Sequence, residues 1–302
     1  KYAPVTLLAA LEEVRDHDMK LAIVGLPCHL HGLYNLLEVW PILRQAIRFT
    51  IGLVCDRTMT AAAVDFLVDA ADLEDEPRIL YFRDKQTGGY PGSVRVMGRD
   101  GDHAVLSPSL RHAIKDIFTP ARCRLCFDKM NVLADVTVGD PWGIADADMA
   151  EGESVLICRT EVGSGLVKQA VNRGSLDLRP VAYGEILRGQ KIEDRRRNWY
   201  AYCAAWQRLG HPLPDSCEAA DTNLSSQATG CFERRLRAGL DLDEHGSRSD
   251  VILDARKALV RQAVRARLGL LLRLPAALAQ RAKELVDHLI ARLGAAERRS
   301  ET

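Results

Sequence analysis

Two short apolar runs that each end near a cysteine constrain the fold of this chain most strongly. The run Leu21–Val24 leads through Gly-Leu-Pro into Cys28, and the run Ile47–Val54 leads directly into Cys55. Apolar runs of this length, bounded by loop residues, are typical of buried strands. Because ligands bind at the carboxyl edge of open α/β sheets, we expect both thiols to lie at such an edge.

The following segments alternate between strand-like and helix-like patterns. We predict a helix over Thr58–Ala71 with Thr58 as its N-cap, and a helix over Ser164–Asn172 that is opened by the glycines at 163 and 165. Shorter β-like segments, the first two separated by a glycine turn over 88–92, are Ile79–Phe82, Ser93–Met97, Val136–Val138 and Val155–Cys158. The sequence therefore predicts an α/β fold with a mixed-sheet core.

The composition changes after residue 189. Residues 190–200 are polar and charged, residues 210–230 have the composition of a loop, and a helical pattern runs from Val251 to about Leu293 with a break at Pro275. We predict an α/β core over 1–189 and a mainly helical C-terminal extension over 190–302. Residues 251–302 hold eleven Lys or Arg and five Asp or Glu, so this basic helix either packs on its own domain or docks on a partner or membrane surface.

Charge and hydropathy exclude several classes of function. The formal net charge of the 302 residues is zero, which gives no global electrostatic basis for binding nucleic acid. No run of eighteen apolar residues predicts a membrane span, and no signal-peptide pattern is present, so we expect a cytoplasmic protein. The first residues, Lys1-Tyr2, lack an initiator Met, and we interpret the chain as N-terminally truncated.

Four of the eight cysteines have the spacing of a metal site. Cys123-Arg-Leu-Cys126 supplies two thiols close in sequence, and Cys28 and Cys55 supply two more at the expected sheet edge. Four thiolates suit a [4Fe–4S] cluster or a tetrahedral zinc ion, and the residues alone leave both open. They also leave open that Cys28 and Cys55 are small buried hydrophobic side chains. Four further cysteines are interpreted as structural: Cys158 in a strand core, and Cys203, Cys217 and Cys231.

The order of several motifs resembles the coenzyme F420 hydrogenase/dehydrogenase beta-subunit family. The Gly25-Leu-Pro-Cys28 loop is similar to the Gly-Thr-Pro-Cys loop of that family, and a strand ending in Cys55 follows it. The later matching motifs, all within about residues 1–185, are Phe82-Arg-Asp-Lys85, Arg122-Cys-Arg-Leu-Cys126, Ala134-Asp135 and Gly139-Asp-Pro-Trp-Gly143.

This resemblance implies a flavoprotein core that holds FAD beside a [4Fe–4S] cluster. It implies that Cys28, Cys55, Cys123 and Cys126 bind the cluster, and that Lys85 is the catalytic cation near the flavin. His29 stands where the family usually has Gln. The cofactor-binding residues that the resemblance implies are Gly25, Pro27, His29, Arg83, Lys85, Gly139, Asp140, Trp142 and Gly143.

The function implied is that of an oxidoreductase. It would pass electrons between a hydride carrier, coenzyme F420 or a similar small redox substrate, and the cluster through FAD, with ferredoxin or a redox subunit as partner. Two alternatives stay open. One is a ferredoxin-dependent reductase of a small pigment or metabolite, and the other is a non-catalytic assembly protein with a four-cysteine zinc site.

Overall fold

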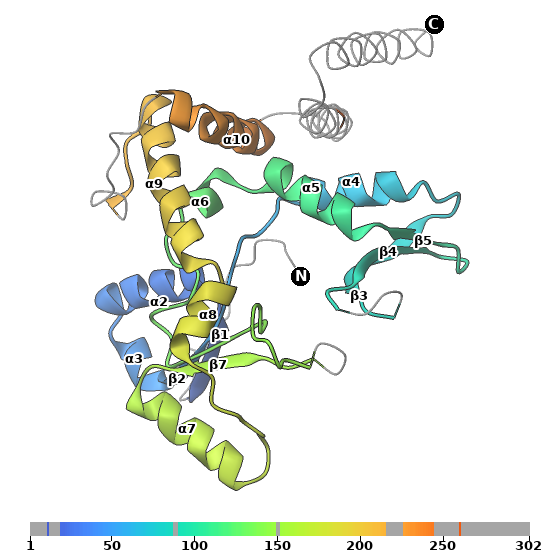
Figure 1. Cartoon of the computed structure of the whole chain (residues 1–302). Helices are drawn as coiled ribbons and strands as arrows, with labels where there is room; N and C mark the ends of the chain where they lie inside the picture. The colour runs from blue at the N-terminus through green and yellow to red at the C-terminus, as the bar shows by residue number, and fades with distance from the viewer. Residues whose placement is uncertain are drawn as a thin grey trace, which may run out of the picture.

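The computed structural model describes residues 11, 19–86, 90–148, 152–215, 226–244 and 260. Within these residues the chain forms two sheets, one with strand order β1-β2-β6-β7 and one with strand order β3-β4-β5. Helices flank both sheets and continue into a helical C-terminal part (Figure 1). The predicted α/β fold with a mixed sheet and a mainly helical C-terminal region is confirmed for these residues.

The first sheet sets the position of the cysteines. Its strands are β1 (Leu21–Gly25), β2 (Ile47–Leu53), β6 (Val136–Gly139) and β7 (Val155–Cys158). Strands β1, β2 and β6 are parallel, and β7 is antiparallel to β6. Gly25 pairs with Gly52, so Cys28 and Cys55 each follow a paired glycine by three residues. The register of two parallel strands therefore delivers both thiols to one edge.

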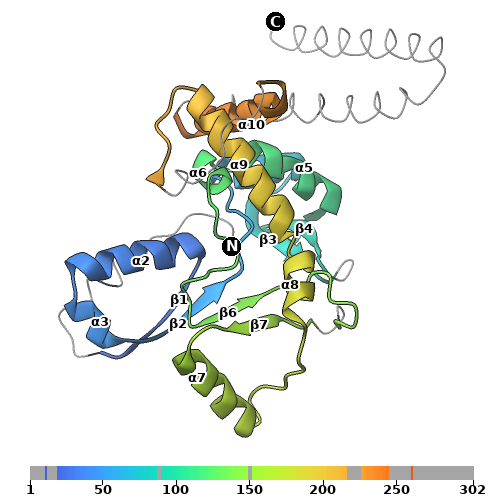
Figure 2. The same cartoon turned by 60° about the vertical axis from the view of Figure 1, so that its left-hand side comes forward.

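A leucine-rich helix anchors this sheet. Helix α2 (Pro27–Val39) presents Leu30, Leu33 and Leu37 to a core that also contains residues of β1 and of α3 (Ile42–Ala46). This spacing places the three leucines along one helix face. Helix α7 (Glu161–Asn172) contacts β7 and β2, and Figure 2 shows it apart from α2 and α3. The start of α2, which carries Cys28, is thus fixed against the sheet.

The second sheet is an antiparallel meander. Its strands are β3 (Pro77–Asp84), β4 (Ser93–Gly98) and β5 (His103–Leu106), and helices α4 (Ala62–Ala71) and α5 (Pro108–Phe118) pack on it. The strands predicted over 79–82 and 93–97 are confirmed with slightly wider bounds. Residues 87–89, which include part of the predicted glycine turn, lie outside the described residues.

Four helices carry the chain over the cysteine-bearing edge and beyond it. They are α6 (Ala121–Arg124), α8 (Tyr183–Gly189), α9 (Ile192–Arg208) and α10 (Ser226–Glu244). Helix α9 runs past α6 to α10 (Figures 1 and 2), and an apolar cluster joins all three helices. Apart from residue 260, the helix predicted from Val251 to Leu293 lies outside the described residues, as does Cys217. Among the helices that are described, none combines the length and apolar character that crossing a bilayer requires.

Three local predictions were wrong. Helix α4 begins at Ala62, and Thr58 is a buried residue of the loop that joins β2 to α4, because residues 54–61 form no regular element. Helix α7 begins at Glu161, where the Thr160 hydroxyl accepts a hydrogen bond from the Gly163 N–H at 3.1 Å, so the glycines at 163 and 165 lie inside the helix. Cys158 is exposed, because it ends an edge strand.

Candidate functional site

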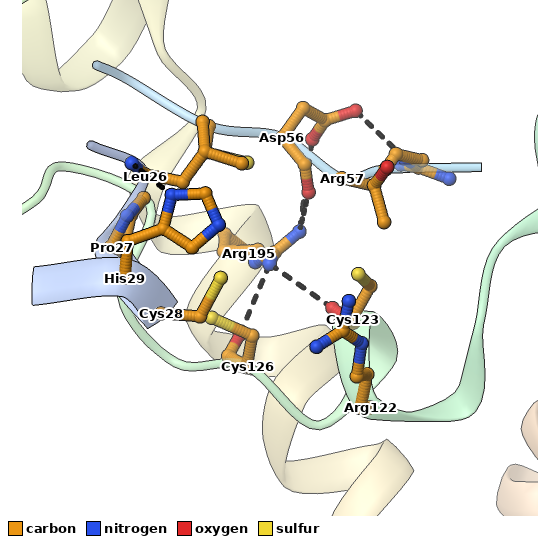
Figure 3. A pocket seen from close by; sticks show the side chains of 12 residues that line it. Leu26, Pro27, Cys28, His29, Asp56, Arg57, Arg122, Cys123, Cys126 and Arg195 are labelled. Carbon is orange, nitrogen blue, oxygen red and sulfur yellow. Dashed lines mark hydrogen bonds and ion pairs between the residues drawn. The ribbon is translucent and has the colours of Figure 1, made fainter. Parts of the chain in front are cut away.

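The four cysteines predicted to bind a metal line one pocket. They come from three separate stretches of chain, residues 28, 55 and 123–126, and Figure 3 shows the side chains of this pocket from close by. None of the four forms a disulfide. The other lining residues are Leu26, Pro27, His29, Asp56, Arg57, Thr58, Arg122 and Arg195.

Local structure fixes each thiol. Cys28 lies in the first turn of α2, directly beyond β1. Cys55 follows β2, and its N–H donates to the Lys129 carbonyl at 2.9 Å. Cys123 lies in the single turn of α6, and Cys126 lies two residues beyond the end of that turn. The loop that starts at Cys126 is thus tied to the strand end that carries Cys55.

The thiols are electrostatically coupled. Burial is the largest cause that raises the pKa of the Cys55 thiol to about 12, and the neighbouring sulfurs of Cys123, Cys126 and Cys28 contribute in that order. Burial also raises the pKa of Cys126, against the opposing charge of Arg195. The thiols of Cys55 and Cys126 therefore favour the neutral form until a cationic group replaces their protons.

The four cysteine side chains lie around one pocket and do not meet at a single metal position. Among the described residues, no three His, Cys, Asp or Glu side chains lie close enough together to hold a single metal ion. A tetrahedral zinc ion requires all four sulfurs at about 2.3 Å from one centre, whereas a cubane cluster binds one thiolate at each iron corner. Four soft donors along the wall of one pocket fit the larger group.

Charged side chains frame the pocket. Arg57 pairs with Asp56 at 2.9 Å, and Arg195 reaches the same Asp56 from α9. Burial opposes ionisation of Asp56, but the cations of Arg57, Lys129 and Arg195 outweigh it and lower its pKa. Sequence reasoning missed these residues. The only signal for Arg195 was its place in the charged stretch 190–200, which indicated only a change of composition.

A buried amide holds the two strand ends at this edge. Asn131 is fully buried, and its side-chain N–H donates to the carbonyls of Gly25 at 2.9 Å and Leu53 at 3.3 Å. A Cβ atom on Gly52 would lie 2.5 Å from the Asn131 side chain. Gly52 therefore leaves the space in which Asn131 bridges β1 and β2.

Two predicted cofactor-binding residues, Pro27 and His29, line the cysteine pocket, and a third, Gly25, lies just before them in the chain. Gly25 ends β1, and Pro27 and His29 lie in the first turn of α2. The His29 ring Nδ1 accepts a hydrogen bond from the Leu26 N–H at 3.3 Å, so this side chain already satisfies a backbone group at the helix start.

The other predicted residues form a second cluster, which we call the Tyr90 cluster. Arg83 of β3 pairs with Asp140, just beyond β6, at 2.9 Å between Nη1 and Oδ2. The Lys85 ammonium lies 5.5 Å from the centre of the Tyr90 ring, and the Trp142 ring lies 5.2 Å from the same ring. Tyr90 was not singled out from the sequence, because the glycines and the proline around it indicated only a turn.

Two glycines of the predicted set serve close packing beside the Tyr90 cluster. Gly139 ends β6, where a Cβ atom would lie 2.5 Å from the Val54 side chain. Gly143 has a φ of +74°, and a Cβ atom there would lie 2.6 Å from the Gly189 Cα atom at the end of α8. The loop that carries Asp140 and Trp142 is therefore held tightly against α8.

Helix α5 lies near both groups of residues. Burial lowers the pKa of Lys115, the carboxylate of Asp56 opposes this shift, and the cations of Arg57 and Arg83 add to it. Asp56 and Arg57 line the cysteine pocket, while Arg83 belongs to the Tyr90 cluster. The pKa of Lys115 therefore depends on charges at both the cysteine pocket and the Tyr90 cluster.

Comparison with known proteins identifies related sequences. Residues 18–183 match the family model for the C-terminal part of the coenzyme F420 hydrogenase/dehydrogenase beta subunit. The chain is 31% identical over 221 residues to the beta subunit of the coenzyme F420 hydrogenase of Methanothermobacter thermautotrophicus, covering 69% of this chain and 71% of that protein. It is 29% identical over 167 residues to one subunit of the F(420)H(2) dehydrogenase of Methanosarcina mazei, covering 54% of this chain and 42% of that protein.

The fold has a counterpart among solved structures. A chain of the F420-reducing [NiFe] hydrogenase complex from Methanosarcina barkeri superimposes with a TM-score of 0.50 at 20% identity, covering 71% of this chain and 72% of that chain. At this identity the likeness concerns the fold. The present chain spans less than half the length of the Methanosarcina mazei dehydrogenase relative, with 42% covered.

Proposed function

This chain belongs to the coenzyme F420 hydrogenase/dehydrogenase beta-subunit family, and we propose that it is an iron–sulfur flavoprotein oxidoreductase. In this proposal electrons pass between a hydride carrier, coenzyme F420 or a similar compound, and a [4Fe–4S] cluster through FAD. The observation that carries the proposal is the gathering of Cys28, Cys55, Cys123 and Cys126 around one pocket.

The chemistry of the pocket suits a cluster. The four thiols would bind it as thiolates, and Arg57, Arg122 and Arg195 supply positive charge along the same pocket. A cluster with four thiolates is anionic, so these cations would stabilise it electrostatically. When bound, the cluster supplies one-electron transfer.

The Tyr90 cluster supports the flavin part of the proposal. Its Arg83 and Lys85 offer positive charge, and the partly exposed ring of Trp142 offers an aromatic face. When bound, FAD supplies the exchange between two-electron hydride chemistry and single electrons. Lys85 would stabilise negative charge that develops on the reduced ring system, an effect that strengthens where water is excluded. Asp140 would keep Arg83 in position.

The partner and the substrate are further parts of the proposal. The names of two relatives describe subunits of F420-linked enzymes, which supports coenzyme F420 as substrate and a redox subunit or ferredoxin as partner. We place the protein in the cytoplasm. The second candidate function keeps both cofactors and reduces a small pigment or metabolite with electrons from ferredoxin. Cofactor analysis does not separate these two candidates, so the test must compare electron donors.

The test begins with protein purified without oxygen. Iron, acid-labile sulfide, zinc and flavin are measured per chain, and an absorption spectrum is recorded. We expect about four irons and one flavin. Reduced coenzyme F420, reduced ferredoxin and dithionite are then added separately, and the flavin band and the cluster signal are followed in time.

Each outcome decides between the candidates. Bleaching of the flavin band by reduced coenzyme F420, followed by a change in the cluster signal, supports the first proposal. Reduction by ferredoxin alone supports the second candidate. Zinc without iron or flavin in freshly purified protein supports the assembly protein and contradicts both redox candidates.

A further inference from the structure

Three side chains on one face of α9 bind the segment that contains Cys123 and Cys126. Arg195, Trp199 and Tyr202 follow the spacing i, i+4 and i+7, which places them on the same side of a helix. Their partners are backbone or side-chain atoms of residues 123–126. Helix α9 begins at Ile192, beyond the family match that ends at residue 183.

Arg195 makes the most direct contact. Its Nη2 atom donates to the carbonyl of Cys123 at 3.3 Å and to the carbonyl of Cys126 at 3.1 Å, and its Nη1 atom donates to the carbonyl of Asp56 at 2.8 Å. Figure 3 shows these contacts converging on the guanidinium from two sides of the pocket. One planar cation thus joins the Cys-x-x-Cys turn to the residue that follows Cys55.

Trp199 and Tyr202 hold the residues between the two cysteines. The Trp199 indole N–H donates to the carbonyl of Leu125 at 3.0 Å, and a guanidinium N–H of Arg124 donates to the Tyr202 hydroxyl at 2.9 Å. Both hydrogen bonds are buried. Buried bonds of this kind cost more to break than exposed ones, because the freed polar group has no water to replace its partner.

We propose that α9 is part of the cysteine site, and that Arg195 is a positioning residue that raises the reduction potential of the bound cluster. The inference rests on the proposed [4Fe–4S] cluster and adds a role for a helix outside the matched family segment. The Arg195 side chain is only 16% exposed, and its Nε atom is buried without a hydrogen-bond partner in this structure. A buried cation with a donor to spare fits beside an anionic group.

The charge of Arg195 gives the inference a measurable consequence. Reduction adds one negative charge to the cluster, and a nearby cation stabilises the more negative state. Replacing this cation with a neutral side chain therefore shifts the equilibrium towards the oxidised cluster. We expect a shift of about tenfold, which corresponds to about 59 mV for a one-electron couple.

The experiment compares Arg195→Gln and Arg195→Lys with the control Arg196→Gln in the full-length chain. Arg196 is the next residue on the same helix, and it is exposed with a hydrogen bond to Tyr200. Iron per chain, thermal stability and the midpoint potential from an electron paramagnetic resonance titration are measured. We expect a lower potential in Arg195→Gln, most of it restored in Arg195→Lys, and the wild-type value in Arg196→Gln.

A second pair of variants tests the positioning role without removing charge. Trp199→Phe keeps an aromatic ring but loses the indole donor. Its control is Trp206→Phe on the same helix, which loses an exposed indole hydrogen bond to the carbonyl of Pro212 beyond the helix end. We expect iron release to a chelator to become about fivefold faster in Trp199→Phe, the effect of losing about 1 kcal/mol of buried hydrogen bonding, and to stay unchanged in Trp206→Phe. This pair tests the positioning role of α9 even if Arg195→Gln does not fold.

Failure of this inference is distinct from failure of the proposed function. Wild-type protein that never contains an iron–sulfur cluster overturns the proposed function and the inference with it. A wild-type cluster together with equal potentials in Arg195→Gln and Arg196→Gln overturns only the role of Arg195 in setting the potential. Equal iron release from Trp199→Phe and Trp206→Phe overturns the positioning role of α9.

Discussion

The cysteine pocket and the Tyr90 cluster are both built from residues that the sequence analysis singled out, but they differ in how far their polar groups are already satisfied. The four thiols line a pocket with no disulfide and no convergence on one ion. In the Tyr90 cluster, by contrast, Arg83 pairs with Asp140 and Lys85 lies over an aromatic ring.

This difference shows which site is ready to receive a ligand. The backbone around the pocket is fixed by parallel strands and by α9, which holds the cysteine-bearing segments in place. In the Tyr90 cluster, Lys85 and Trp142 are exposed, and both already contact the Tyr90 ring. The cluster part of the proposal therefore stands on stronger geometry than the flavin part.

The largest expected effect comes from removing a thiol. We expect Cys28→Ser, Cys55→Ser, Cys123→Ser and Cys126→Ser each to lose most of the bound iron, because a hydroxyl is a poor ligand for a soft site. Iron per chain after anaerobic purification measures this. The exposed cysteines give matched controls, and Cys158→Ser and Cys231→Ser should keep the wild-type iron content. Full iron retention in Cys123→Ser would falsify the ligand assignment.

The next effect concerns the Tyr90 cluster. We expect Lys85→Ala to slow flavin reduction by about tenfold, since it removes one cation near the developing charge, while iron content stays at the wild-type level. Stopped-flow absorbance of the flavin band measures the rate, and Lys85→Arg should recover most of it. Lys168→Ala on α7 is the control. An equal rate in Lys85→Ala and wild type would remove Lys85 from the catalytic role and sharpen the contrast between the two sites.

A third prediction concerns the pH dependence of the cluster-free protein. Because burial raises the pKa of Cys55 from 9.0 to about 12, its neutral thiol stabilises the fold below about pH 9, and this contribution is lost as the pH rises from there towards the raised pKa. The free energy of unfolding should fall by about 1 kcal/mol over the first pH unit of this window. Denaturant titrations at about pH 9 and about pH 10 measure this fall in the free energy of unfolding. Cys55→Ser should show a smaller fall, and an equal fall would contradict the shifted pKa.

The smallest expected effect concerns the ion pair between Arg83 and Asp140, which joins β3 of one sheet to the loop after β6 of the other. A double-mutant cycle of Arg83→Ala and Asp140→Ala should give a coupling free energy of only about 0.5 kcal/mol, because both side chains are partly exposed. Thermal or denaturant unfolding measures it. A coupling above about 2 kcal/mol would show that the Tyr90 cluster is held as firmly as the cysteine pocket.

Much of the cysteine pocket followed from the sequence. Apolar runs that end at Cys28 and Cys55 predicted strand ends at one edge, and the ordered motifs predicted the family. Both signals are local, since a strand and the loop after it are encoded by neighbouring residues. The assignments of Lys85 and the glycines to a flavin stay predictions, as does the division of the chain at residue 189.

The tertiary structure alone decided which distant side chains complete the site. Arg195 lies 69 positions beyond Cys126, and Asn131 lies 106 positions beyond Gly25. Neither has a local pattern that indicates its partner, because Arg195 belongs to a charged stretch and Asn131 to a loop. The sequence by itself determined the four thiols and the two strands that end shortly before Cys28 and Cys55. Only folding brought α9 over the Cys-x-x-Cys turn, since that contact depends on how helices and sheets pack across the whole chain.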